Sequence, residues 1–83
     1  MKKVLSEMTE LELLTFVKTI YHDDYATEKQ HIAAIFEFER LSEHPAGSDL
    51  IFYPEDDKDS PEAVVEEVKV WRAANGKPGF KSA

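Results

Sequence analysis

Length, composition and charge exclude several classes of protein before any element is considered. The chain has 83 residues, enough for one domain over 1–83 with a small core, and its lack of cysteine excludes disulfides and thiolate chemistry. No apolar run is long enough to span a membrane, and MKKVLSEM is too polar for a secretion signal, so we expect a soluble cytoplasmic protein. The net charge is −7, and the stretch from Asp23 to Glu67 holds fourteen acids against three bases. This stretch disfavours direct binding to nucleic acid and favours a basic partner, although a solvated acidic face kept for solubility is also open.

The first predicted helix covers residues 10–22. Thr9 and Glu12 have the spacing of a capping box, in which each side chain accepts from the other residue's backbone N–H. Apolar residues then recur at spacings of three and four, namely Leu13, Leu14, Val17, Ile20 and Tyr21. The pattern predicts a helix with one buried stripe.

The second predicted helix covers residues 28–42, with a capping box at Thr27 and Gln30 and a stop before Pro45. At about 100° per residue its apolar side chains fall on two faces. One face holds Ala34, Phe38 and Leu41, and the other holds Ile32, Ile35 and Phe36 beside Glu28 and Glu39. Together they cover an arc of about 220°, wider than the 100° or so that a surface helix normally buries. The second face therefore predicts either a partner-binding surface, which we favour, or a helix more fully wrapped by its own bundle.

The stretch HPAGSDLIFYP leaves room between its prolines for about one and a half helical turns. We predict a very short helix over residues 48–52 with Ser48 as a possible N-cap. Because so short a helix is not stable alone, it needs side chains that hold it to the core. We expect Leu50 and Ile51 to supply that attachment and Asp49, Phe52 and Tyr53 to project outward.

The fourth predicted helix covers residues 61–75. Ser60 is its expected cap, Pro61 suits the first helical position, and Gly76 can adopt the left-handed conformation that ends a helix. Its inward face is predicted to hold Val64, Val65, Val68 and Trp71. The tail KPGFKSA is expected to be loosely held, with Phe80 able to dock. The four segments predict an all-α, four-helix bundle with a very short third helix.

No pattern in the chain indicates an enzyme. The histidines His22, beside two aspartates, and His44 are the nearest approach to a metal or acid/base site. His22 lies at a helix end, where charged residues are common, and His44 is expected to bond to backbone where the second helix ends. His31 is equally compatible with an interface and with a solvated position. We therefore expect no catalytic residue, no metal and no cofactor.

Three segments resemble one family. They are TELELLTFVKTI, FERLSEHPAGSDLIFYP and DDKDSPEAVVEEVKVWRAANGKPGF. These segments are similar to the immunity proteins of the DNase-type colicins and pyocins, bacteriocins of enteric bacteria and pseudomonads. The resemblance covers nearly the whole chain without an evident gap, and its strings EHPxGSDLIxYP and VKxWRAANGKxGF are long and unusual.

The resemblance implies an inhibitor of the DNase domain of a cognate colicin or pyocin. Proteins of that family are four-helix bundles with a very short third helix, and they bind beside the nuclease active site, where bulk and negative charge block DNA. We accordingly expect a chain that is monomeric when free and forms a 1:1 complex with its toxin in the producing cell. Release in complex with the bacteriocin would follow.

The resemblance also implies which residues bind. Shared anchors come from the third helix, here the anchor segment of Gly47, Ser48, Asp49, Phe52, Tyr53 and Pro54. Selection of the cognate toxin comes from the second helix, here the selecting face of Glu28, His31, Ile32, Ile35, Phe36 and Glu39. One departure is that Phe52 replaces the first tyrosine of the family's usual pair, which removes a hydroxyl.

Two other functional classes are considered. One is a general acidic DNA mimic, which would depend on net charge and tolerate loss of the aromatics. The other is a helical adaptor that uses the face around Phe36 to associate with itself. Alanine variants of Asp49 or Tyr53 separate the inhibitor from the mimic, and sedimentation of the isolated chain identifies an adaptor.

Overall fold

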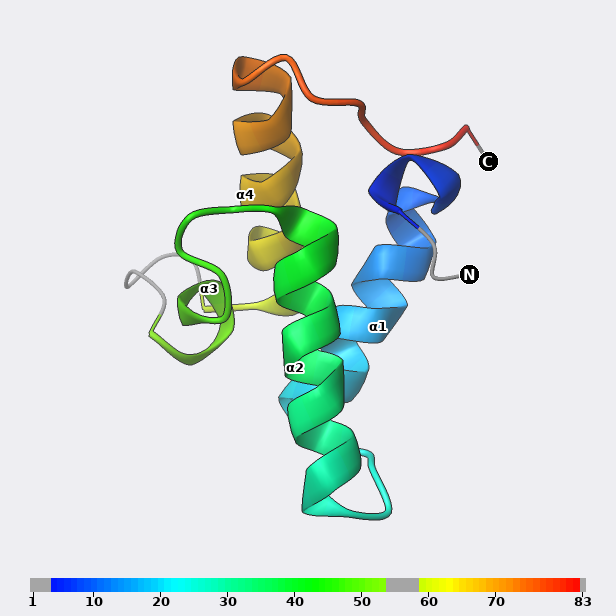
Figure 1. Cartoon of the computed structure of the whole chain (residues 1–83), viewed down its shortest axis with the longest axis vertical. Coiled ribbons are helices and arrows are strands. Elements are labelled where there is room, and N and C mark those ends of the chain that lie inside the picture. Colours follow the sequence, from blue (N-terminus) through cyan, green and yellow to red (C-terminus); the bar gives the residue numbers. More distant parts are fainter. Residues whose placement is uncertain (1–3, 54–58, 83) are drawn as a thin grey trace.

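The computed structural model describes residues 4–53 and 59–82, and every regular element in those ranges is a helix (Figure 1). A short 3-10 helix, η1 (Leu5–Glu7), precedes four α-helices. They are α1 (Glu10–His22), α2 (Glu28–Ser42), α3 (Asp49–Phe52) and α4 (Pro61–Ala74). The predicted all-α fold with a very short third helix is confirmed, and the helix bounds agree within one residue. The sequence did not predict η1.

The helices begin where side chains satisfy free backbone N–H groups. At α1 the capping box is complete, because Glu12 N donates to Thr9 Oγ1 at 3.1 Å and Thr9 N donates to Glu12 Oε1 at 2.8 Å. At α2 only half of the predicted box forms. Thr27 accepts from Gln30 N, but the Gln30 side chain accepts from Ala26 N at 3.2 Å rather than from Thr27.

The helix ends rely on left-handed backbone. Asp23 after α1 and Glu43 after α2 have φ of 52° and 56°. Beyond α4, Gly76 takes the left-handed conformation predicted for it, with φ of 68°. At the start of α4, Ser60 caps as predicted by accepting from Ala63 N at 3.1 Å.

One core joins all the helices. α1 packs against α2 and α4. α3 packs against α4, and in Figure 1 α3 and α1 lie on opposite sides of α2. The buried apolar residues are Leu5, Leu13, Val17, Ile20, Ala34, Phe38, Leu41, Ile51, Val64, Val65 and Val68. The predicted stripes of α1 and α4 supply most of this set. Trp71, predicted to face inward, is only partly buried, because it packs against His44 at the edge of the core.

The tail after α4 is docked rather than loosely held. It runs back over the molecule to η1 (Figure 1), where Lys81 N donates to the carbonyl of Met8 at 2.8 Å. Arg72 Nε donates to the carbonyl of Pro78 at 3.0 Å, and Phe80 packs against the core. The expectation of a loose tail is therefore wrong, although the docking of Phe80 is as foreseen.

Candidate partner-binding surface

The two predicted faces of α2 are separated in the structure. Phe38 is fully buried, whereas Phe36 is 64% exposed and Ile32 is 44% exposed. Ile35 lies between these extremes, since it packs against the core and keeps part of its surface open. Two exposed apolar side chains one turn apart thus stand outside the bundle. This arrangement favours the interface over full wrapping of α2.

The anchor segment, which lies next to α2 (Figure 1), exposes its aromatic side chains to solvent. Tyr53 is 80% exposed and Phe52 is 46% exposed, while Ile51, the residue of α3 that faces the core, is 6% exposed. Asp49 is exposed and, within the described part of the chain, has no ion-pair or side-chain hydrogen-bond partner. The segment therefore offers two rings and a carboxylate to solvent while Ile51 holds it to the core. Leu50 is partly buried against the core as well.

The predicted role of Ser48 as a side-chain cap is wrong. Ser48 occupies the N-cap position of α3, but its backbone is helical, with φ −66° and ψ −14°, and its side chain accepts no cap hydrogen bond. Its backbone N–H instead donates to Oε2 of Glu39 on α2 at 3.2 Å. Gly47 beside it is buried and left-handed, with φ of 51°. Pro54, the last predicted member of the anchor segment, lies outside the described residues.

His31 of the selecting face turns towards the end of α1. Its Nε2 lies 3.1 Å from the carbonyl of Ile20 and its Nδ1 lies 3.4 Å from Asp23 Oδ1, while its ring centroid is 5.5 Å from that of Tyr25. Because the side chain is 18% exposed, the solvated position considered for it is wrong. Burial raises the pKa of the neighbouring Tyr25 hydroxyl, and the negative charges of Asp23 and Asp24 raise it further. The contacts of His31 with Ile20 and Asp23 therefore hold α2 to the end of α1.

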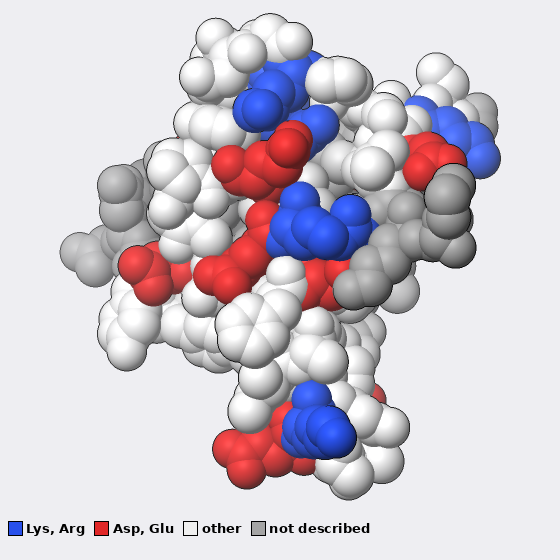
Figure 2. Space-filling model, viewed as in Figure 1, with Lys and Arg blue, Asp and Glu red and all other residues white. Residues whose placement is uncertain are grey.

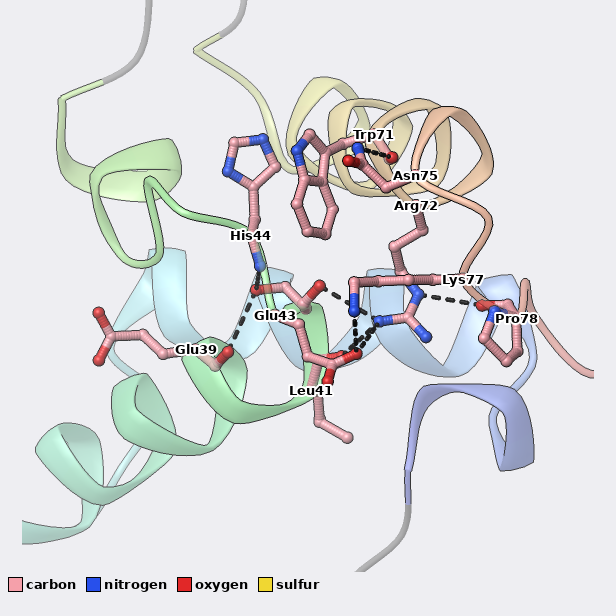
Figure 3. Close-up of polar contacts among 10 residues, drawn as sticks. Glu39, Leu41, Glu43, His44, Trp71, Arg72, Asn75, Lys77 and Pro78 are labelled. Atoms are coloured by element: carbon pink, nitrogen blue, oxygen red, sulfur yellow. Dashed lines mark hydrogen bonds and ion pairs between the residues drawn. The ribbon is translucent and has the colours of Figure 1, made fainter.

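His44 fixes the turn that leads into the anchor segment. Its Nδ1 accepts from Ala46 N at 3.0 Å, as expected for a bond to backbone. Since Nδ1 is an acceptor, Nε2 carries the proton and donates to Glu67 Oε2 at 3.2 Å. The imidazole also packs on Trp71 with centroids 5.0 Å apart (Figure 3). These contacts with α4 were not predicted.

Arg72 is a buried charged residue whose structural role was not predicted. Although charged, it is only 4% exposed, and its guanidinium lies at the carboxyl end of α2 (Figure 3). Nη1 donates to the carbonyls of Leu41 and Ser42 at 3.4 and 3.3 Å and to Glu43 Oε2 at 2.9 Å. The hydrogen bond from Arg72, followed by the charge of Lys77, lowers the pKa of the Glu43 carboxyl.

The surface charge is mixed rather than uniformly negative. Figure 2 shows acidic side chains across the middle of this face, with basic groups interspersed among them. Glu37 pairs with Arg40, and Glu43 pairs with Arg72 and Lys77. Glu28, like Asp49, has no such partner within the ranges that the structure describes. These two carboxylates are therefore the acids of this surface that no residue in the described ranges pairs.

Within residues 4–53 and 59–82, no group of three or more histidines and acids is arranged to hold a metal ion. Among the helices found in these ranges, none has the length and apolar character needed to cross a bilayer. The geometry thus defines a small helical protein whose distinguishing feature is an exposed aromatic and acidic surface built from α2 and α3.

Comparison with known proteins assigns the family. Residues 5–74 match the family described as colicin immunity protein / pyocin immunity protein, so the chain belongs to that family. It is 54% identical to the pyocin-S2 immunity protein and 52% identical to the pyocin-S1 immunity protein, both of Pseudomonas aeruginosa, over 99% of each chain. The resemblance found in the sequence is confirmed, and membership agrees with the prediction that the chain is not an enzyme.

Two solved structures share the fold. The crystal structure of the pyocin AP41 DNase–immunity complex contains a chain with a TM-score of 0.89 and 37% identity, covering 99% of this chain and 100% of that one. The structure of a mutant nuclease domain of pyocin S8 with its cognate immunity protein matches with a TM-score of 0.89 and 39% identity, covering 98% and 100%. In both cases the related protein is seen with a nuclease domain.

Proposed function

We propose that this chain binds the DNase domain of a cognate pyocin or colicin and inhibits it. The observation that carries the proposal is the pair of exposed rings at the end of α3, Phe52 and its C-cap neighbour Tyr53, together with the exposed Phe36 on the adjacent helix α2 (Figure 1). Aromatic side chains presented on a fixed scaffold and ringed by charge have the composition of a binding hot spot. Family membership and the complexes of its relatives support the same conclusion.

The surface has two parts with different tasks. The anchor segment supplies contacts that any toxin of the class can use, since α3 presents Asp49, Phe52 and Tyr53 as one unit. The selecting face supplies bulk and shape, in which Phe36 and Ile32 project furthest. Specificity then depends on how well a given nuclease accommodates the side chains of α2, because poorly fitted rings and unpaired charges are costly.

Inhibition requires no entry into the nuclease active site. Bound beside that site, the chain's bulk and the carboxylates of Glu28 and Asp49 exclude DNA, because its phosphate backbone is repelled by negative charge. The basic nuclease itself is attracted by the same carboxylates, which raises the rate of association at low salt. We place this action in the cytoplasm of the bacterium that makes the toxin, before release of the complex.

The test is a panel of purified DNase domains from several pyocins and colicins. For each domain the dissociation constant and the rate of DNA cleavage are measured with and without this chain. We expect a 1:1 complex that abolishes cleavage by at least one domain. Failure to bind or inhibit every domain would remove the proposed function.

The same panel separates the two other classes. If the chain were a general acidic mimic, its inhibition would fall as the salt concentration rises. Phe52→Ala and Tyr53→Ala would leave that inhibition unchanged. A self-associating adaptor would sediment as a dimer at micromolar concentration without any nuclease. Leu11→Ala is the matched surface control, since Leu11 is a 70% exposed apolar side chain on α1, outside the surface.

A further inference from the structure

A hydrogen bond between residues nine apart in the sequence joins the anchor segment to a side chain of α2. The backbone N–H of Ser48 donates to Glu39 Oε2 at 3.2 Å. Its neighbours behave differently, since Gly47 N and Asp49 N donate to main-chain carbonyls of the preceding turn at 2.9 and 3.0 Å. The Glu39 carboxylate, which points away from Arg72 (Figure 3), thus completes the hydrogen bonding of the turn before α3.

Gly47 leaves the space that this carboxylate occupies. A Cβ atom at Gly47 would lie 2.7 Å from Glu39 Oε2, closer than side-chain carbons approach other atoms. Gly47 is also buried and has φ of 51°, a conformation that favours glycine. Only glycine at position 47 therefore leaves room for the Glu39 carboxylate in this position.

We propose that Glu39 is a positioning residue, which orients the anchor segment relative to the selecting face instead of pairing with the nuclease. This inference rests on the proposed function. A helix of four residues cannot hold its orientation by helix propensity, so it must be fixed at both ends. Ile51 fixes it to the core, and the Glu39 carboxylate fixes the turn at its start through a charge-assisted hydrogen bond.

Two substitutions separate positioning from direct pairing. Glu39→Gln removes the charge but keeps an oxygen that can accept from Ser48 N–H, whereas Glu39→Ala removes both. We expect Glu39→Ala to weaken binding to the cognate DNase domain by about 10- to 100-fold, and Glu39→Gln to stay within about fivefold of the parent chain. Equal losses for the two variants, falling as salt rises, would overturn the inference.

A double-mutant cycle tests whether Glu39 acts through the rings. If it does, Glu39→Ala should weaken binding by less than about threefold in a chain that already carries Phe52→Ala and Tyr53→Ala. Undiminished loss in that background would mean that Glu39 contributes independently of α3. Such additivity would contradict a positioning role.

The free chain provides a readout that needs no nuclease. We expect amide hydrogen exchange from Ser48 to Tyr53 to be at least about fivefold faster in Glu39→Ala and unchanged in Glu39→Gln. Glu28→Ala is the matched control, because it removes an acid of the selecting face and should leave this exchange unchanged. Unaltered exchange in Glu39→Ala refutes the inference, whereas a parent chain that binds no nuclease refutes only the proposed function.

Discussion

Arg72 Nη1 lies 2.9 Å from Glu43 Oε2, and this ion pair joins the last turn of α4 to the residue that ends α2. The same nitrogen donates to two carbonyls of the final turn of α2, which have no intrahelical donor. A cation at this end of a helix is also favoured by the helix dipole. Because the chain passes directly from Glu43 into the turn before α3, Arg72 sets the exit from α2 on which the anchor segment is built.

Replacing Arg72 by methionine should destabilise the protein by about 2–3 kcal/mol, since several buried carbonyls lose a charged donor. Urea unfolding gives the free energy of unfolding for the comparison. Lys77→Met is the control, because Lys77 makes a more exposed ion pair with Glu43 at 3.7 Å and should cost less than about 1 kcal/mol. Similar losses in the free energy of unfolding for the two variants would show that the burial of Arg72 adds nothing to stability.

The stability that ionised Glu43 contributes should disappear at low pH. Arg72 and then Lys77 lower the pKa of Glu43 in the folded chain below its ordinary value of 4.5. This contribution is therefore complete above pH 4.5 and is lost as the pH falls through the lower folded pKa. We expect the free energies of unfolding of the parent and Glu43→Gln to differ at pH 7 and to converge as the pH falls from 4.5 through the lower folded pKa. A difference independent of pH would contradict the assignment.

Tyr53→Ala should weaken binding to the cognate DNase domain by about 2 kcal/mol or more without unfolding the chain. The reason is that the Tyr53 side chain is 80% exposed and contributes little to the core. Ile51→Ala gives the contrast, since Ile51 is 6% exposed and its truncation should cost about 2–5 kcal/mol of stability. Titration calorimetry and thermal melts of both variants make the comparison. An unchanged affinity of Tyr53→Ala would remove Tyr53 from the anchor segment.

Phe36→Ala should change which toxins are bound more than it changes folding. Phe36 is 64% exposed, so its truncation should alter the free energy of unfolding by less than about 1 kcal/mol. The measurement is the melting temperature together with the dissociation constants for a panel of DNase domains. A large loss of stability with an unaltered binding profile would place Phe36 among the structural residues.

Phe52→Tyr should test the departure from the family's tyrosine pair. If a toxin presents a polar group that the hydroxyl would satisfy, the variant should bind that toxin more tightly by about 1–3 kcal/mol. Because Phe52 is 46% exposed, stability should be unaffected. Competition binding of the two chains to each nuclease domain gives the difference directly. Identical affinities across the panel would mean that no toxin in it uses the hydroxyl.

The local rules of the sequence were sufficient for most of the fold. Thr9 and Ser60 marked helix starts and Gly76 marked an end, because caps depend on residues within one turn of each other. The split between Phe38 and Phe36 likewise follows from helical periodicity. Tyr53, the C-cap residue of α3, is exposed as expected, because Leu50 and Ile51 take the core-facing positions of this segment.

Contacts between distant segments could not be obtained in that way. The hydrogen bond from Ser48 N–H to Glu39 depends on how the turn after α2 folds back, which spacing alone does not give. His31 was undecided because its acceptor, the Ile20 carbonyl, belongs to another helix. Arg72 did carry a signal, since it falls on the stripe of Val65 and Val68, but a charged residue there is ordinarily expected at the surface.

The closure of the tail onto η1 also determines how the molecule can be handled. Lys81 is hydrogen-bonded to Met8, and Figure 1 shows the tail running to η1 on the side of the molecule away from α3. A fluorophore, purification handle or sensor-chip linker attached to this docked tail would therefore stand clear of the exposed rings.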